Sequence, residues 1–238
     1  MINDYKKKFI NSEYYIIHLA NPTDKESVHG SNFLTISLEI MKKLCQLSHV
    51  IQPKKIINFS SGKVNWTINH NTTITENPLG NVKYECEKYL NKNVYIETGV
   101  ENIRLYNAYG PNQRNDYLVP KIFDAIYKNK KLKLGTVNHK RDFIYIKDVI
   151  NSLSYLIDSD QVHNVYELGT GVEVKVEDLI NKIFEKTKKK IPIFIDDSLK
   201  RDYELKNELA NTFLLKNLGW SPQYNIDTGI EETVKYYE

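Results

Sequence analysis

Lys54-Lys55-Ile56-Ile57-Asn58-Phe59-Ser60-Ser61 is a mostly apolar stretch that closes on two serines. A short run of this kind is typical of a strand that is buried on both faces of a parallel sheet. Such a strand needs helices that cover the sheet. The segments before and after residues 54–61 therefore decide the fold class.

Strand and helix patterns alternate on both sides of this stretch. Residues 14–20 form a second apolar run that predicts another strand buried on both faces, and apolar residues at helical spacing predict a helix over about 32–49. A helix over about 81–94 and a strand over 101–107 follow. Three such repeats predict an α/β fold with a parallel, Rossmann-like sheet, whose functional residues collect where the strands end.

The pattern loosens after residue 115 into a mixed α/β lobe. Helices are predicted over 119–128, 147–158, 176–189, 211–218 and 226–237, and strands over 131–134, 142–146, 164–168 and 191–195. Pro192 gives the last strand an edge position. We expect a partial Rossmann-like domain at 1–115 and mainly a substrate-binding lobe at 116–238, with some segments returning to the sheet.

Composition limits the classes of protein that fit. The 238 residues are 41% hydrophobic, enough for a sizeable core, and 33 basic against 30 acidic residues give a net charge of only +3. This balance indicates neither a nucleic-acid nor a membrane partner. Cys45 and Cys86 form no disulfide or zinc pattern, the six histidines show no metal spacing, and no apolar run is long enough for a membrane helix. We expect a cytoplasmic protein without a metal.

Several motifs carry a family resemblance. Residues 78–87 read Pro-Leu-Gly-Asn-Val-Lys-Tyr-Glu-Cys-Glu and predict a loop that opens onto a helix. Residues 102–114 read Asn-Ile-Arg-Leu-Tyr-Asn-Ala-Tyr-Gly-Pro-Asn-Gln-Arg, and residues 141–149 read Arg-Asp-Phe-Ile-Tyr-Ile-Lys-Asp-Val. Together with Leu-Gly-Trp-Ser-Pro at 218–222, they resemble the extended short-chain dehydrogenase/reductases, the NAD-dependent nucleotide-sugar epimerases and dehydratases.

The resemblance implies a catalytic set with one gap. Ser61 would hydrogen-bond the substrate oxygen, and Lys83 would lower the pKa of the catalytic Tyr and bind the cofactor ribose. The position of that Tyr holds Leu79. The alternative register uses Tyr84 and Lys88, which form a literal Tyr-x-x-x-Lys, and we favour Lys83. As isolated residues, Ser61 is a strand-end serine that satisfies backbone groups and Lys83 is a surface lysine.

The resemblance also implies a site for a nucleotide-diphosphate sugar. Asn107 would hold the diphosphate region, and Arg141 and Arg201 would contact phosphate or ribose, because the planar guanidinium suits phosphate oxygens. For Asp142 and Asp148 we favour helix capping and loop hydrogen bonding. Residues 169–171, Gly-Thr-Gly, are not a dinucleotide fingerprint, because neither a third glycine nor a helix follows.

The family's glycine-rich turn, which holds the pyrophosphate of NAD or NADP, has no counterpart among the ten glycines. We therefore expect an N-terminally truncated member that lacks the first β/α units, with doubtful cofactor binding. The strand at 14–20 would then be an exposed apolar sheet edge, which favours a dimer or pairing with an intact homologue.

These observations leave the activity uncertain. The first hypothesis is a protein of nucleotide-sugar metabolism that retains sugar-nucleotide binding, with impaired or lost NAD(P)-dependent catalysis. The alternatives are a non-catalytic binding or assembly module that pairs with an intact homologue, and a truncated gene product.

Overall fold

The computed structural model describes residues 13–22, 32–200 and 205–238, and the chain divides into two compact units. Unit 1 comprises residues 1–105 and 155–167, and unit 2 comprises residues 106–154 and 168–238. The predicted domains 1–115 and 116–238 stay a prediction.

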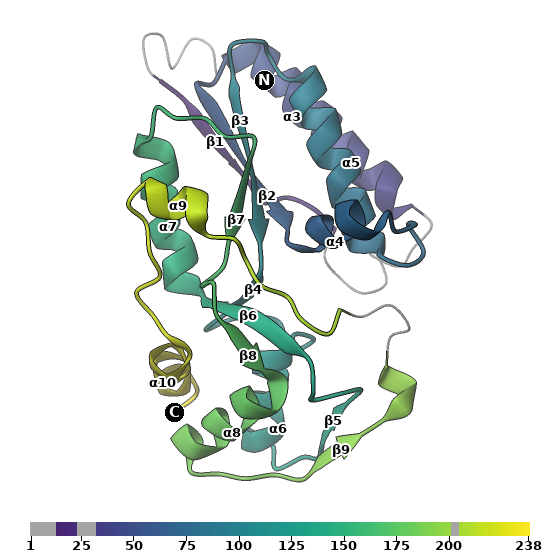
Figure 1. Cartoon of the computed structure of the whole chain (residues 1–238), viewed down its shortest axis with the longest axis vertical. Helices are drawn as coiled ribbons and strands as arrows, with labels where there is room; N and C mark the ends of the chain where they lie inside the picture. The colour runs from purple at the N-terminus through teal and green to yellow at the C-terminus, as the bar shows by residue number, and fades with distance from the viewer. Residues whose placement is uncertain (1–12, 23–31, 201–204) are drawn as a thin grey trace. The chain divides into compact units, whose positions relative to one another are not determined.

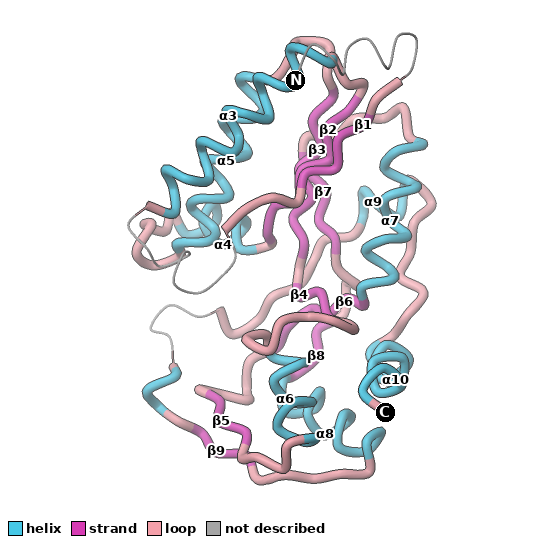
Figure 2. Tube along the Cα trace, turned by 180° about the vertical axis from the view of Figure 1, so that it is seen from behind, coloured by secondary structure: helices cyan, strands magenta, loops and turns pink. Residues whose placement is uncertain are grey.

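Unit 1 is built on a parallel sheet. Its strands are β1 (Tyr15–His18), β2 (Lys55–Ser61) and β3 (Gly99–Leu105), which pair in parallel, with β7 (Val165–Leu168) next to β3. The helices α3 (Phe33–Ile51), α4 (Lys63–His70) and α5 (Pro78–Asn93) connect these strands. Both views place α3 and α5 side by side against the sheet (Figures 1 and 2). The predicted α/β fold with a parallel sheet is confirmed.

The core of unit 1 lies between α3, α5 and the sheet. β2 is buried at six of its seven positions, as its apolar run predicted. The buried cluster on this side consists of Phe33, Met41, Leu44, Cys45, Ile56, Val82, Cys86, Leu90 and Val100. Both cysteines are therefore free thiols inside a helix-to-sheet core.

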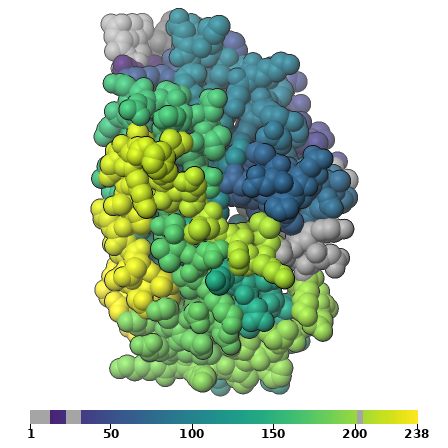
Figure 3. All heavy atoms as spheres, in the orientation of Figure 1, coloured from purple at the N-terminus to yellow at the C-terminus, as the bar shows by residue number. Residues whose placement is uncertain are grey.

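Unit 2 is a mixed lobe with two small sheets. β4 (Asn107–Tyr109) pairs in parallel with β6 (Lys140–Tyr145), and β6 pairs antiparallel with β8 (Glu173–Lys175). β5 (Leu132–Leu134) pairs in parallel with β9 (Ile193–Ile195). The helices are α6 (Leu118–Tyr127), α8 (Val176–Thr187), α9 (Phe213–Asn217) and α10 (Ile226–Tyr237), and α7 (Ile146–Asp158) begins here. Figure 3 shows α10, in yellow, beside α8, in green, on the surface of this unit.

The structure corrects three local predictions. Pro78, Leu79 and Gly80 form the first turn of α5 and not a loop, because Asn77 accepts the backbone N–H of Gly80 at 3.2 Å and proline occupies the first helical position. β1 is not buried on both faces, since Ile17 is 39% exposed. The short elements α4 and β8 were not predicted, because neither carries a regular apolar period.

Candidate functional site

Lys83 is the lysine of α5 that reaches the central strand. Its Nζ donates to the carbonyl of Phe59 in β2 at 2.9 Å, and desolvation lowers the pKa of its ammonium group. Lys88 lies on the exposed side of the helix, where its Nζ pairs with Glu85 at 2.6 Å and lies 4.8 Å from the ring centroid of Tyr84. The geometry therefore favours Lys83 over the Tyr84 and Lys88 register, and the catalytic role stays a prediction.

Leu79, four residues before Lys83, lies at the edge of the apolar core. It is partly buried and packs against the cluster between α3, α5 and the sheet. Gly80 next to it is fixed by a close approach, because a Cβ at this position would lie 2.5 Å from the carbonyl oxygen of Lys63. The helix therefore starts tightly against α4, and the position of the family Tyr carries no titratable group.

Ser61 ends β2 and faces the start of α4. Its Oγ accepts the backbone N–H of Lys63 at 3.2 Å, as expected of a strand-end serine that satisfies backbone groups. The side chain is partly exposed. The structure thus places Ser61 and Lys83 at the same end of β2, in unit 1.

A buried ion pair next to these residues was missed by the sequence analysis. Arg104 in β3 donates from Nε and Nη2 to the carboxylate of Glu87 in α5 at 3.2 and 2.7 Å, and Ser60 Oγ donates to the same carboxylate at 2.5 Å. Arg104 Nη1 also donates to Asn65 Oδ1 in α4 at 2.6 Å. The sequence offered one signal. Two residues of opposite charge, Glu87 and Arg104, occupy positions at which an apolar core residue is usual. The network ties α4 and α5 to β2 and β3.

A second polar network crosses the sheet of unit 1. His18, Asn58 and Asn102 lie in register on β1, β2 and β3. Asn58 joins its neighbours through a 2.9 Å contact with His18 Nδ1 and a 2.7 Å hydrogen bond to Asn102 Oδ1. Burial lowers the pKa of His18. These contacts hold three neighbouring strands together.

In unit 2, Asn107 and Arg141 lie on the paired strands β4 and β6 and meet at Glu208. Asn107 Nδ2 donates to Glu208 Oε2 at 3.2 Å, and Arg141 Nε lies 3.4 Å from the same oxygen. The side chains of Arg141 and Glu208 are both only 8% exposed. Two predicted binding residues are therefore brought together around an acidic residue that the sequence analysis did not name. Arg201 lies outside the described residues.

Asp142 and Asp148 organise loops. The carboxylate of Asp142 accepts the backbone N–H groups of Thr170 at 2.7 Å, Gly171 at 2.9 Å and Ala210 at 3.2 Å. Asp148 accepts the backbone N–H groups that follow α9, those of residues 223 and 224, at 2.9 and 3.1 Å. Both contacts follow the loop hydrogen bonding that we favoured for these residues.

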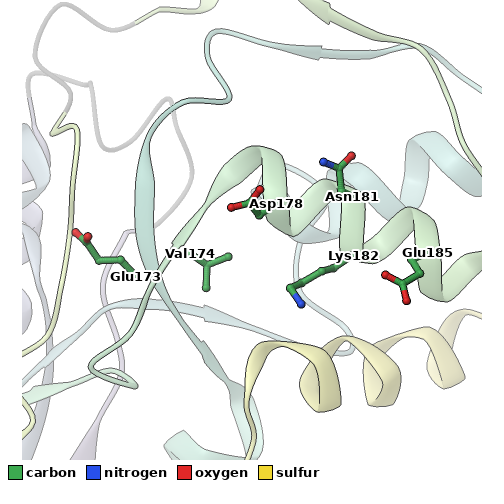
Figure 4. A pocket seen from close by; sticks show the side chains of 6 residues that line it. All are labelled: Glu173, Val174, Asp178, Asn181, Lys182 and Glu185. Carbon is green, nitrogen blue, oxygen red and sulfur yellow. The ribbon is translucent and has the colours of Figure 1, made fainter.

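A hollow on the surface of unit 2 is lined by none of the predicted binding residues, although Val174 in its lining pairs with Arg141 across the strands β6 and β8. It is lined by Glu173, Val174, Asp178, Asn181, Lys182 and Glu185 (Figure 4). Its lysine is already engaged, because Lys182 Nζ donates to Asp227 at 2.6 Å. In the part of the chain that the structure describes, no group of histidine, cysteine and acidic side chains could hold a metal, and no helix is long and apolar enough to cross a membrane.

Lys83 is the residue that the resemblance assigns to the dinucleotide cofactor. The family fold holds the pyrophosphate on a glycine-rich turn before a helix, and the ten glycines of the sequence contain no such cluster. Lys83, the predicted ribose contact, is hydrogen-bonded to Phe59.

The chain resembles curated proteins of deoxysugar nucleotide chemistry. It is 32% identical over 143 residues to CDP-abequose synthase of Salmonella typhimurium, which covers 56% of this chain and 47% of that protein. It is 26% identical over 252 residues to a trifunctional UDP-glucose 4,6-dehydratase, epimerase and reductase of Arabidopsis thaliana, which covers 93% of this chain and 36% of that protein. The chain spans about half the length of the first curated relatives it matches, 52% and 47%.

Solved structures share the fold. An epimerase of Methanothermobacter thermautotrophicus superposes with a TM-score of 0.84 at 21% identity, covering 99% of this chain and 75% of that chain. RMD of Pseudomonas aeruginosa, complexed with NADPH, gives 0.83 at 20% identity, covering 100% of this chain and 86% of that chain. UDP-glucose 4-epimerase of Thermotoga maritima, with UDP-glucose, gives 0.80 at 21% identity, covering 94% and 76%.

The family model described as GDP-mannose 4,6 dehydratase matches residues 83–233, which is more than half of the chain. The matched range begins at Lys83 and includes the motifs around Asn107 and Arg141. The chain therefore belongs to the GDP-mannose 4,6 dehydratase family, within the extended short-chain dehydrogenase/reductases that act as nucleotide-sugar epimerases and dehydratases.

Proposed function

We propose that this chain binds a nucleotide-diphosphate sugar and that it has impaired or lost NAD(P)-dependent catalysis. The observation that carries the proposal is the side chain at position 79. Leu79 is partly buried against an apolar core four residues before Lys83, where the family resemblance expects the Tyr that moves the proton. Proton transfer to or from a sugar needs a titratable group, and leucine has none.

The binding part of the proposal rests on unit 2 and on the relatives. Asn107 and Arg141 converge on one oxygen, so they can also converge on one acceptor atom of a ligand. The guanidinium group of Arg141 suits a phosphate or a ribose, and Arg201 is proposed as a further ligand. A solved structure with the same fold contains UDP-glucose, which supports this class of ligand.

Ser61 and Lys83 are the proposed remnants of the catalytic set. Ser61 would hydrogen-bond a substrate oxygen, although its Oγ now accepts a backbone N–H. Lys83 would contact the ribose of NAD or NADP, the cofactors seen in proteins of the same fold. With leucine at position 79, Lys83 has no phenolate at that position to stabilise.

Calorimetric titration tests the proposal. NAD(H) and NADP(H) are titrated separately from UDP-, dTDP-, GDP- and CDP-sugars, and Arg141→Lys serves as the conservative variant that loses the bidentate fork. We expect heat of binding from at least one sugar nucleotide, weaker binding in the variant, and none from the dinucleotides. Failure of every sugar nucleotide to bind would refute the binding half, and tight NAD(P) binding with turnover would refute the catalytic half.

A second candidate is an assembly module that pairs with an intact homologue. In the described part of the chain, β1 pairs only with β2 and so forms an edge of the four-stranded sheet. Ile17 is 39% exposed and Leu19, just after the strand, is 66% exposed. Exposed apolar edges are sites of strand pairing. Analytical ultracentrifugation of the chain, alone and mixed with an intact homologue, tests whether it forms a complex. The variant Leu19→Lys should weaken any such complex.

A further inference from the structure

Glu208 occupies the acceptor position of the Asn107 and Arg141 pair. Both residues direct an N–H group to the same oxygen, Glu208 Oε2, at 3.2 Å from Asn107 Nδ2 and 3.4 Å from Arg141 Nε. The carboxylate is almost fully enclosed, with 8% of the side chain exposed. An anionic oxygen of a ligand that took both donors would have to lie where this carboxylate oxygen lies.

The rest of the Arg141 guanidinium group is engaged as well. Its Nη1 donates to the carbonyl oxygens of Lys140 at 2.8 Å and Lys206 at 3.4 Å, and its Nη2 lies 3.4 Å from His139 Nδ1. All of these partners belong to unit 2. Arg141 is thus held by several contacts within unit 2, among them the carboxylate of Glu208.

The backbone around Glu208 is tied to β6. Lys140 N donates to Lys206 O at 2.8 Å, Glu208 N donates to Lys140 O at 3.2 Å, and Ala210 N donates to Asp142 Oδ2 at 3.2 Å. Asn207 forms a parallel bridge with Lys140. The segment 205–210 therefore lies along the edge of β6 and presents Glu208 to the two binding residues.

We infer that Glu208 determines the charge of the ligand group that Asn107 and Arg141 can accept. This inference rests on the proposed sugar-nucleotide binding and makes it more specific. With Glu208 in place, a phosphate that contacted these donors would lie next to a buried carboxylate. Two negative charges in contact repel strongly in a poorly solvated site. A phosphate takes both donors only when Glu208 and its segment move away, whereas a neutral sugar hydroxyl can donate its O–H to the Glu208 carboxylate and leave it in place.

The experiment compares the wild-type chain with Glu208→Gln, which keeps the shape of the side chain and removes its charge. The matched control is Glu231→Gln, because Glu231 is an exposed glutamate of the same unit whose ion pair with Lys186 lies on the surface. Inorganic pyrophosphate and UDP-glucose are titrated into each protein. Thermal unfolding of each variant checks that it is folded.

The inference predicts that pyrophosphate binds Glu208→Gln about tenfold or more tightly than it binds the wild-type chain, since a repelling charge has been removed. Glu231→Gln should stay within about twofold of wild type, because exposed charges are screened. Equal, weaker or undetectable pyrophosphate binding by Glu208→Gln would overturn the inference. Tighter pyrophosphate binding without UDP-glucose binding would instead support the inference and count against the proposed function.

If Glu208→Gln does not fold, a measurement on the wild-type chain tests the inference about Glu208. Amide hydrogen exchange of residues 205–210 is followed with and without saturating pyrophosphate. Faster exchange at Glu208 and Ala210 in the presence of pyrophosphate is expected, because both amides lose their partners on β6 when the segment moves. Unchanged or slower exchange would contradict the inference.

Discussion

Replacing Glu87 by glutamine should destabilise unit 1 far more than the same change at Glu85 on the same helix. Glu87 is 4% exposed at its side chain and Arg104 is 10% exposed, with Arg104 Nη2 2.7 Å from Glu87 Oε2. Breaking a buried ion pair by removing one partner costs about 3–5 kcal/mol, because the remaining charge is left without compensation in a poorly solvated site. This loss is a large share of a typical unfolding free energy of about 5–15 kcal/mol.

Glu85→Gln is the matched control. Glu85 pairs with Lys88 at 2.6 Å, but the two side chains are 51% and 45% exposed for Lys88 and Glu85, respectively. Exposed pairs of this kind contribute about 0.2–1 kcal/mol, so the control should change the free energy of unfolding by less than about 1 kcal/mol. The two substitutions remove the same charge from the same type of residue on the same helix. They differ in how deeply the side chain is buried.

Urea denaturation followed by circular dichroism measures both losses, after coincidence of two probes has been checked. The additional variant Arg104→Met, alone and combined with Glu87→Gln, completes a double-mutant cycle. The double variant should lose less stability than the sum of the single variants, because no unpaired charge remains. A Glu87→Gln loss within about 1 kcal/mol of the Glu85→Gln loss would refute the argument that a buried network fixes α5.

Three further predictions concern the pH dependence of the unfolding free energy, the loop contacts of Asp142 and the side chain at position 79. Burial raises the pKa of Glu101 from 4.5 to about 7 against the opposing effect of Lys55, so between these pH values the folded chain holds a proton that the unfolded chain has lost. The free energy of unfolding should therefore fall as pH rises from 4.5 to about 7, by up to about 3 kcal/mol, and urea titrations should show a smaller fall in Glu101→Gln. Asp142→Asn should cost about 2 kcal/mol or more in the same assay, because a buried carboxylate accepts several N–H groups, and an unchanged midpoint would contradict this. Leu79→Tyr should lower the unfolding free energy by about 1–3 kcal/mol, since the larger phenol must fit where the leucine packs against an apolar core, and should restore no turnover; measurable turnover would contradict it.

The sequence predicted the parts of the fold that follow from regular apolar patterns. The apolar run at β2 is buried at six of seven positions, and both β2 and α3 were predicted within a few residues. The predicted apolar face of α3 was only partly right, because Phe33 and Leu44 are buried but Ile36 is 46% exposed. The start of α5 was wrong because the Asn77 cap makes Pro78 helical, and the proline and glycine were taken as loop residues. α4 buries only Val64 and Thr67, too few positions to create a period.

The candidate residues were predictable one at a time, but their contacts were not. Lys83 and Arg141 stand out in recognisable motifs. Glu208 lies 101 positions from Asn107 in the sequence, and only tertiary structure brings it to the same oxygen. Glu87 and Arg104 belong to the quoted motifs, yet their pairing depends on how α5 packs on β3. Long-range polar contacts leave no local pattern in the sequence.

The most direct test of the central claim is an assay of the wild-type chain with each sugar nucleotide that it binds, in the presence of NAD or NADP. Proton NMR of the sugar ring follows epimerisation, dehydration or reduction of the substrate. The account predicts saturable sugar-nucleotide binding and no conversion, because Leu79 cannot transfer a proton. Conversion that depends on NAD or NADP and stops in Lys83→Met would contradict it.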